Sequence, residues 1–196
     1  MSSLVTRPAP DFKAKAVMPD GSIGEISLSE YSGQYVLLYF FPLAFTFVCP
    51  TEILAFDRRL KDFKNRSCAV IGVSVDSQHT LAAWRNTPVK QGGIGAIGHP
   101  VAADLNKAIT KAYGILHEEE VALRGLFLLD REGVVRHALV NDLPLGRSVD
   151  EALRTLDALQ YHEANGEVCP ANWQRGDEAM AATPDGVAGY LARHAA

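Results

Sequence analysis

The sequence predicts an α/β fold in which helices flank a central mixed β-sheet, with an N-terminal hairpin and a C-terminal extension. Two apolar runs, at 35–41 and 68–75, have the composition of strands buried on both faces, and a segment of helical period follows each. Strand pairs joined by turn residues lie before and after this region, at 11–28 and 123–140. This order of elements is typical of a mixed sheet covered by helices.

The N-terminal hairpin is expected from two partly alternating segments, Asp11–Val17 and Ile23–Leu28. Between them, Met18-Pro19-Asp20-Gly21 has turn chemistry, because proline presets φ and glycine accepts a positive φ. Tyr35–Phe41 then forms the central strand, and Pro42 ends it because proline has no N–H to give to a neighbouring strand.

The segment after Pro42 changes period. Beyond Cys49, apolar residues recur every three or four positions as far as Phe63, which predicts one amphipathic helix. Pro50 suits the first helical position, where a missing N–H costs nothing. We therefore expect Cys49 at the N-terminus of a helix, on a strand–loop–helix turn.

Such a position favours ionisation of the thiol, because unpaired N–H groups and the positive end of the helix dipole stabilise the reactive thiolate. A thiol of pKa ~8.5 is only ~3% ionised at pH 7, so nearly complete ionisation raises the reactive thiolate fraction about thirty-fold. Enzymes commonly accelerate their reactions by about 10⁶-fold or more, so ionisation alone is not enough. Other groups must stabilise charge on the substrate, and the Thr46 hydroxyl is the nearest candidate. A lone cysteine is more often a small buried hydrophobe, so the combination of Cys49 with Thr46 at this turn carries the interpretation.

The rest of the chain continues the same pattern. It predicts a strand at Cys68–Val75, a helix at Ser77–Asn86 with Asp76 as N-cap, a glycine-rich loop at Thr87–His99 and a short helix at Asn106–Tyr113. The hairpin strands Leu123–Leu129 and Val134–Val140 follow, then a helix at Ser148–Ala164. We expect two domains, 1–164 and a C-terminal extension at 165–196 that begins as a loop and holds a helix at Val187–Arg193. The order of elements resembles a thioredoxin-like α/β domain.

Composition excludes several classes of function. Of 196 residues, 47% are apolar, as in an ordinary globular protein, and the net charge is −4 without any basic block. Nucleic-acid binding is therefore disfavoured. No apolar run is long enough to span a bilayer, and residues 1–11 lack the pattern of a signal peptide, so we expect a cytoplasmic protein without a membrane partner. The six histidines form no metal-binding motif, and we expect neither a metal nor a cofactor.

Three cysteines in a cytosolic chain argue against a framework of structural disulfides. Cys68 opens a buried strand and is interpreted as structural. Cys169 falls in a loop, where an exposed thiol is usually incidental or a modification site, unless a second, activated thiol makes it a partner. The sequence leaves open whether Cys49 and Cys169 would meet within one chain or between two.

With these residues in place, the chain resembles the peroxiredoxin family, and within it the typical two-cysteine group of alkyl hydroperoxide reductase C and the thioredoxin peroxidases. The resemblance runs from about Asp11 to the C-terminus. It rests on a P-x-x-x-T-x-x-C motif at 42–49, on 123–127, which matches the strand with the active-site arginine, and on 166–173, which looks like the segment of the resolving cysteine.

The resemblance assigns six site residues: Cys49, Cys169, Thr46, Arg124, Pro42 and Glu52. It implies that the Cys49 thiolate attacks hydrogen peroxide or an alkyl hydroperoxide and becomes a sulfenic acid, which Cys169 converts to a disulfide between two subunits. A thioredoxin or a flavoprotein disulfide reductase then restores both thiols.

The other four residues are implied to support this reaction. Thr46 and Arg124 hydrogen-bond the thiolate and the peroxide, Pro42 shields the site from water, and Glu52 orients Arg124. Without the resemblance, Arg124 would be a solvated residue at a strand end, and Glu52 a capping carboxylate in the first turn of a helix.

The resemblance also implies a homodimer that assembles into a ring, usually a decamer. Two departures concern over-oxidation: members prone to it carry Gly-Gly-Leu-Gly and a C-terminal Tyr-Phe, whereas this chain has Gly92-Gly93-Ile94-Gly95 and Tyr190-Leu191. Leucine packs less area than phenylalanine, so we expect intermediate sensitivity to sulfinic acid formation.

Three alternatives stay open. A thiol–disulfide oxidoreductase would need C-x-x-C at the turn, but position 52 is Glu. In a one-cysteine peroxidase Cys169 would be incidental. A holdase chaperone would need exposed apolar surface, and no such segment stands out in the sequence.

Overall fold

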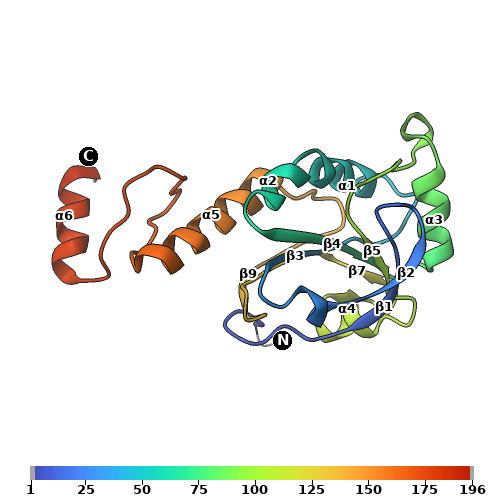
Figure 1. The fold of residues 1–196 in the computed structure, drawn as a ribbon, viewed down its shortest axis with the longest axis horizontal. Helices are drawn as coiled ribbons and strands as arrows, with labels where there is room; N and C mark the ends of the chain where they lie inside the picture. Colours follow the sequence, from blue (N-terminus) through green and yellow to red (C-terminus); the bar gives the residue numbers. More distant parts are fainter. Residues whose placement is uncertain (1–2, 195–196) are drawn as a thin grey trace. The chain divides into compact units, whose positions relative to one another are not determined.

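A computed structural model describes residues 3–194 (Figure 1). The chain forms two compact units, 1–149 and 150–196. The expected domain boundary after residue 164 stays a prediction. Among the described residues, no helix has the length and apolarity needed to cross a membrane.

The first unit is built on a seven-stranded sheet of order β2-β1-β5-β4-β3-β8-β9. Its strands are β1 (Lys13–Val17), β2 (Ile23–Ser27), β3 (Tyr35–Phe40), β4 (Cys68–Ser74), β5 (Val101–Ala103), β8 (Arg124–Leu129) and β9 (Val135–Asn141). β3 pairs parallel with β4 and antiparallel with β8, so the predicted mixed sheet is confirmed. Both predicted hairpins are present, as β1–β2 and β8–β9.

Helices cover both faces of this sheet. They are α1 (Cys49–Arg58), α2 (Leu60–Lys64), α3 (Gln78–Asn86) and α4 (Ala108–Ala112), with 3-10 turns η1 (Leu28–Tyr31) and η2 (Val89–Gln91). In Figure 1, α1 and α2 lie on one face of the sheet and α4 on the other. The predicted α/β architecture with helices on both sides is therefore confirmed.

The central strand β3 is buried on both faces, as its continuous apolar sequence predicts, and all six of its residues are buried. Val36, Leu38 and Phe40 join a core that includes Tyr113 next to α4. Tyr39 alternates with them and stacks on Phe56 of α1, with ring centroids 4.6 Å apart. One strand thus supports the packing on both sides of the sheet.

The structure corrects three sequence-based expectations. The helix predicted from Cys49 to Phe63 is two helices, because Arg59 (φ −101°, ψ 9°) leaves the helical conformation between them. Ser77, rather than Asp76, is the N-cap of α3 and accepts from Thr80 N–H, while the Asp76 carboxylate is used elsewhere. The short strands β5, β6 (Leu116–His117) and β7 (Val121–Ala122) were not predicted; with two or three residues each, they carry too little pattern.

The second unit contains α5 (Val149–Asn165), which begins one residue before it, and α6 (Pro184–His194). The segment between the two helices is loop-like, as predicted, apart from one antiparallel bridge between Val168 and Met180. The helix expected at 187–193 is found within α6.

Candidate active site

Cys49 is the first residue of α1, so its predicted place at the start of a helix is confirmed. Pro50 follows in the first turn, where it removes no helical hydrogen bond. The Cys49 side chain is fully buried. Its sulfur therefore lies at the positive end of a helix and out of bulk water, with neighbours that decide its chemistry.

The loop between β3 and α1 is held in place by contacts with the segment from Asp76 to Trp84. Pro42 is buried two residues after the end of β3, because the strand ends at Phe40 rather than at Phe41 as expected. The Ala44 N–H donates to the Asp76 carboxylate at 2.7 Å, which explains why that carboxylate does not cap α3. Phe45 adopts a left-handed φ of 57°, a conformation that costs roughly 1 kcal/mol. Its ring packs against that of Trp84, with ring centroids 5.9 Å apart.

Thr46 occupies the end of this loop next to the sulfur. Its Oγ1 lies 2.9 Å from Sγ of Cys49 and 2.7 Å from the carbonyl oxygen of Leu43. A hydroxyl has one proton, so sulfur and carbonyl compete for it. A thiolate at Cys49 is a stronger acceptor than the Leu43 carbonyl, because hydrogen bonds to ionised acceptors are stronger than those to neutral ones.

Arg124 approaches the same sulfur from the first residue of β8. Its Nη1 lies 3.5 Å from Cys49 Sγ and donates to Glu52 Oε2 at 2.6 Å, while its Nε donates to the Leu143 carbonyl at 2.7 Å. The Arg124 side chain is only 4% exposed, which rules out the interpretation as a solvated strand-end residue. Two fixed acceptors, Glu52 Oε2 and the Leu143 carbonyl, thus aim the guanidinium at the sulfur.

Arg147 is a member of this cluster that sequence reasoning missed. Its backbone N–H and Nε donate to Oε1 of Glu52 at 2.9 and 2.8 Å, and its Nη2 donates to Oε2 at 3.0 Å. Its Nη1 donates to the Gly125 carbonyl at 2.5 Å. Arg147 follows Gly146 outside any motif, and nothing in the local sequence marks it.

The charges of the cluster favour a thiolate. Arg124 and Arg147 are cationic, Glu52 is anionic, and all three are buried. With a neutral thiol the group carries one excess positive charge, and with a thiolate its charges sum to zero. Because an uncompensated buried charge is strongly unfavourable, the cluster stabilises the ionised sulfur. The hydrogen-bond donors of Thr46 and Arg124 are also placed to stabilise charge on a substrate oxygen beside that sulfur.

Cys169 lies in the second unit, on the loop after α5. Its Sγ is 3.6 Å from the Ala158 carbonyl oxygen, and burial raises the pKa of the Cys169 thiol, an effect that Arg154 opposes and Glu167 adds to. Cys68 is buried at the start of β4, as predicted, and burial raises its pKa to about 12. Cys68 is therefore an inert thiol.

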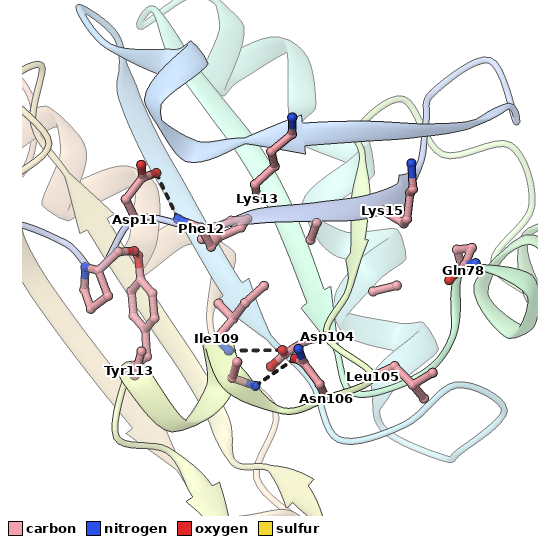
Figure 2. Close-up of a pocket in the computed structure, with 15 residues that line it drawn as sticks. Asp11, Phe12, Lys13, Lys15, Gln78, Asp104, Leu105, Asn106, Ile109 and Tyr113 are labelled. Atoms are coloured by element: carbon pink, nitrogen blue, oxygen red, sulfur yellow. Dashed lines mark hydrogen bonds between the residues drawn. The ribbon is translucent and has the colours of Figure 1, made fainter.

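A pocket of about 590 Å³ elsewhere in the first unit contains none of these groups (Figure 2). It lies between β1 and the segment leading into α4. The Asp104 carboxylate accepts the Ile109 and Thr110 N–H groups. In Figure 2, the side chains of Lys13 and Lys15 are directed away from the Asp104 carboxylate. Among residues 3–194, no three His, Cys, Asp or Glu side chains are grouped so that they could hold a metal ion.

Comparison with known proteins identifies the family of the chain. The model of the AhpC/TSA family matches residues 5–138, and that of the C-terminal domain of 1-Cys peroxiredoxin matches 158–193. Alkyl hydroperoxide reductase C of Helicobacter pylori is 55% identical over 190 residues, 96% of each chain. Peroxiredoxin-2 of Macaca fascicularis is 52% identical over 191 residues, 97% of this chain and 96% of the relative.

The chain is also similar to solved structures of this family. The chain is similar to the reduced 2-Cys peroxiredoxin of Plasmodium vivax, with a TM-score of 0.96 and 50% identity over 97% of this chain and 100% of that one. AhpC of Enterococcus faecalis gives a TM-score of 0.80 and 30% identity, covering 86% of this chain and 100% of that one. The thioredoxin-like fold and these relatives, which match almost the whole chain, define a thiol-dependent peroxidase. The chain belongs to the AhpC/TSA family, the peroxiredoxins.

Proposed function

We propose that Cys49 is the thiolate that attacks hydrogen peroxide and alkyl hydroperoxides. The observation that carries this proposal is the position of its buried sulfur, 2.9 Å from Thr46 Oγ1 and 3.5 Å from Arg124 Nη1. The sulfur forms a bond to the terminal oxygen of ROOH as the O–O bond breaks. Sulfur is oxidised by two electrons to a sulfenic acid, and the departing RO⁻ takes a proton to become ROH.

The surrounding residues stabilise this transfer. Arg124 and Thr46 donate to the oxygens as negative charge moves from sulfur to the leaving group. Glu52 fixes Arg124, and Arg147 fixes Glu52 in turn through three hydrogen bonds. Pro42, buried at the end of β3, keeps water from the sulfur.

Cys169 is proposed as the second thiol of the cycle. It condenses with the Cys49 sulfenic acid, which forms a disulfide and releases water. A dithiol reductant, either a thioredoxin or a flavoprotein disulfide reductase, supplies two electrons by thiol–disulfide exchange and regenerates both thiols. The segment 165–196 would then be the C-terminal extension that carries Cys169 beside a peroxidase domain at 1–164.

Two surfaces of the first unit favour assembly into a ring. β9 is an end strand of the sheet with Val140 47% exposed, and an open strand edge can pair with the same edge of a second copy. The loop before α1 exposes Leu43, Phe45 and Phe47 by 37, 52 and 93%. Two different self-complementary contacts in each protomer join dimers into larger closed assemblies. The expected size, a decamer, rests on the family resemblance, as does a cytoplasmic location.

The exposed loop also corrects the expectation that no apolar segment would be exposed, and it keeps a holdase chaperone as the second candidate function. The Cys49→Ser variant separates the two activities. A chaperone that uses this loop keeps its suppression of client aggregation in Cys49→Ser, whereas peroxidase turnover is lost.

The decisive test is peroxide-dependent NADPH oxidation with thioredoxin and thioredoxin reductase, and in parallel with a flavoprotein disulfide reductase. We expect no turnover in Cys49→Ser, and in Cys169→Ser a single oxidation of Cys49 without a disulfide on non-reducing gels. Turnover by Cys49→Ser would overturn the proposal. Sustained turnover by Cys169→Ser would indicate a one-cysteine peroxidase, and insulin reduction by the wild type would indicate a thiol–disulfide oxidoreductase.

A further inference from the structure

A second buried polar network lies at the opposite end of α1 from Cys49. Its centre is Tyr39 of β3, which is fully buried and has its hydroxyl 2.7 Å from Nε2 of His99. One face of the Tyr39 ring stacks on Phe56, and the Arg147 guanidinium lies 5.5 Å from the ring centroid. The hydroxyl of Tyr39, on a strand buried on both faces, therefore forms its hydrogen bond with a histidine from the loop before β5.

His99 connects this tyrosine to α1. The histidine is 2% exposed, and its Nδ1 has no hydrogen-bond partner but lies 3.6 Å from Oδ1 of Asp57. Burial raises the pKa of Tyr39, so its hydroxyl stays protonated and donates to Nε2. A neutral ring that accepts at Nε2 carries its proton on Nδ1, directed toward the Asp57 carboxylate. His99 in turn lowers the pKa of Asp57 and is the largest cause of that shift.

The contact surface around Asp57 is closely fitted. Its Oδ1 accepts the Gly98 N–H at 2.6 Å. A side chain at Gly98 would come within 2.9 Å of Leu60 Cδ2 and would displace the end of the Leu60 side chain. Phe56 and Asp57 belong to the last turn of α1, whereas Cys49 begins it. The network therefore fastens the far end of a ten-residue helix to β3 and to the loop before β5.

The attachment of α1 matters because the Cys49 sulfur is completely buried. Formation of a disulfide requires a second sulfur about 2.05 Å away, with its own carbon attached. No such group can reach the Cys49 sulfur while α1 keeps it between Thr46 and Arg124. Opening of α1 must come first, and until it does a second peroxide can oxidise the sulfenic acid to the sulfinic form.

We propose that Tyr39, His99 and Asp57 are positioning residues that hold α1 closed and so set how the oxidised Cys49 divides between disulfide and sulfinic acid. This inference rests on the proposed function of Cys49 and Cys169. It assigns no contact with the substrate to any of the three residues. Weakening the network speeds opening of α1 and disulfide formation, and it leaves the first reaction with peroxide unchanged.

Tyr39→Phe is the sharpest test, because it removes one hydroxyl and keeps the ring that packs on Phe56. Loss of a single buried hydrogen bond predicts about five-fold faster disulfide formation and about five-fold more peroxide needed for half-conversion to sulfinic acid. Tyr113→Phe is the matched control: Tyr113 is buried, its hydroxyl donates to the Pro10 carbonyl at 3.0 Å, and its ring contacts Phe40 and Phe127 rather than α1.

Two measurements follow both steps. Stopped-flow tryptophan fluorescence gives the rates of Cys49 oxidation and of disulfide formation, and intact-protein mass spectrometry gives the sulfinic fraction across a peroxide titration. Hydrogen exchange of the α1 amides reports opening of the helix directly, and Asp57→Asn, at a half-buried position, provides a second variant with the same expected direction if Tyr39→Phe folds poorly.

The outcomes are distinct. Faster resolution and faster α1 exchange in Tyr39→Phe, with wild-type behaviour in Tyr113→Phe, support the proposal. Equal resolution in Tyr39→Phe and wild type overturns it, as does equal acceleration in both tyrosine variants, which would reflect general loosening. A slower first oxidation in Tyr39→Phe also overturns it. If wild-type Cys49 is not oxidised at all, the proposed function fails, and this inference, which rests on it, fails with it.

Discussion

Arg147 places its backbone N–H and its Nε on the same carboxylate oxygen of Glu52, at 2.9 and 2.8 Å. The other carboxylate oxygen accepts Arg124 Nη1 at 2.6 Å, and Arg124 continues to the Cys49 sulfur. Glu52 therefore separates two buried cations and fixes the direction of both. By itself, this carboxylate would oppose a thiolate, whereas between two arginines it leaves one positive charge for the sulfur to balance.

Arg147→Gln should slow the reaction of Cys49 with peroxide by about 100-fold, because Arg124 loses its fixed direction and the excess positive charge disappears. Stopped-flow fluorescence measures the rate constant. Arg59→Gln is the control, since Arg59 pairs with Asp62 at a position where both side chains are about 40% exposed. A rate within a few-fold of wild type in Arg147→Gln would show that Glu52 and Arg124 keep their geometry without it.

Thr46→Val removes the hydroxyl 2.9 Å from the sulfur at nearly constant volume. We expect a loss of about 10²–10³ in the rate of peroxide reduction, the usual effect of deleting one donor to a developing oxyanion. Thr51→Val is matched to it: its hydroxyl donates to the Val48 carbonyl on the exposed side of the same helix. Comparable losses in the two variants would mean that the effect comes from the helix start, not from contact with the sulfur.

Cys68 makes the protein less stable at alkaline pH. Burial raises its pKa to about 12, so the folded thiol stays neutral while an unfolded one ionises at about 8.5. Its contribution to stability is complete below the unfolded pKa and is lost as pH rises toward 12. The difference in unfolding free energy between wild type and Cys68→Ala should shrink by about 2 kcal/mol between about pH 8 and pH 10.5, as measured by urea denaturation. A difference independent of pH would contradict the assignment.

Leu191, half exposed on α6, is the position where the family resemblance implies a phenylalanine in members prone to over-oxidation. We expect Leu191→Phe to lower the peroxide concentration that converts half of Cys49 to sulfinic acid, because a larger apolar side chain strengthens packing of the C-terminal helix. Mass spectrometry across a peroxide titration gives this concentration, with Leu191→Met as the volume-conserving control. Resistance of the wild type at millimolar peroxide would contradict the expected intermediate sensitivity.

The sequence alone determined the elements that rest on local patterns. The continuous apolar run of β3, the change of period after Pro42 and the apolar stripe of the following helix placed Cys49 on its strand–loop–helix turn. These signals are contained in a few neighbouring residues, as is the Thr46–Cys49 spacing. The motifs at 42–49 and 166–173 then carried the family resemblance.

Only the tertiary structure decided which distant residues share a buried space. Arg147 meets Glu52, and His99 meets Tyr39, through the packing of loops onto the sheet, and no periodicity or cap records either meeting. Asp76 likewise has the local sequence of a helix cap, but its carboxylate accepts a hydrogen bond from the Ala44 N–H instead. The reason is physical: backbone patterns depend on neighbours along the chain, whereas the charge balance around a buried sulfur depends on every residue that the fold brings to it.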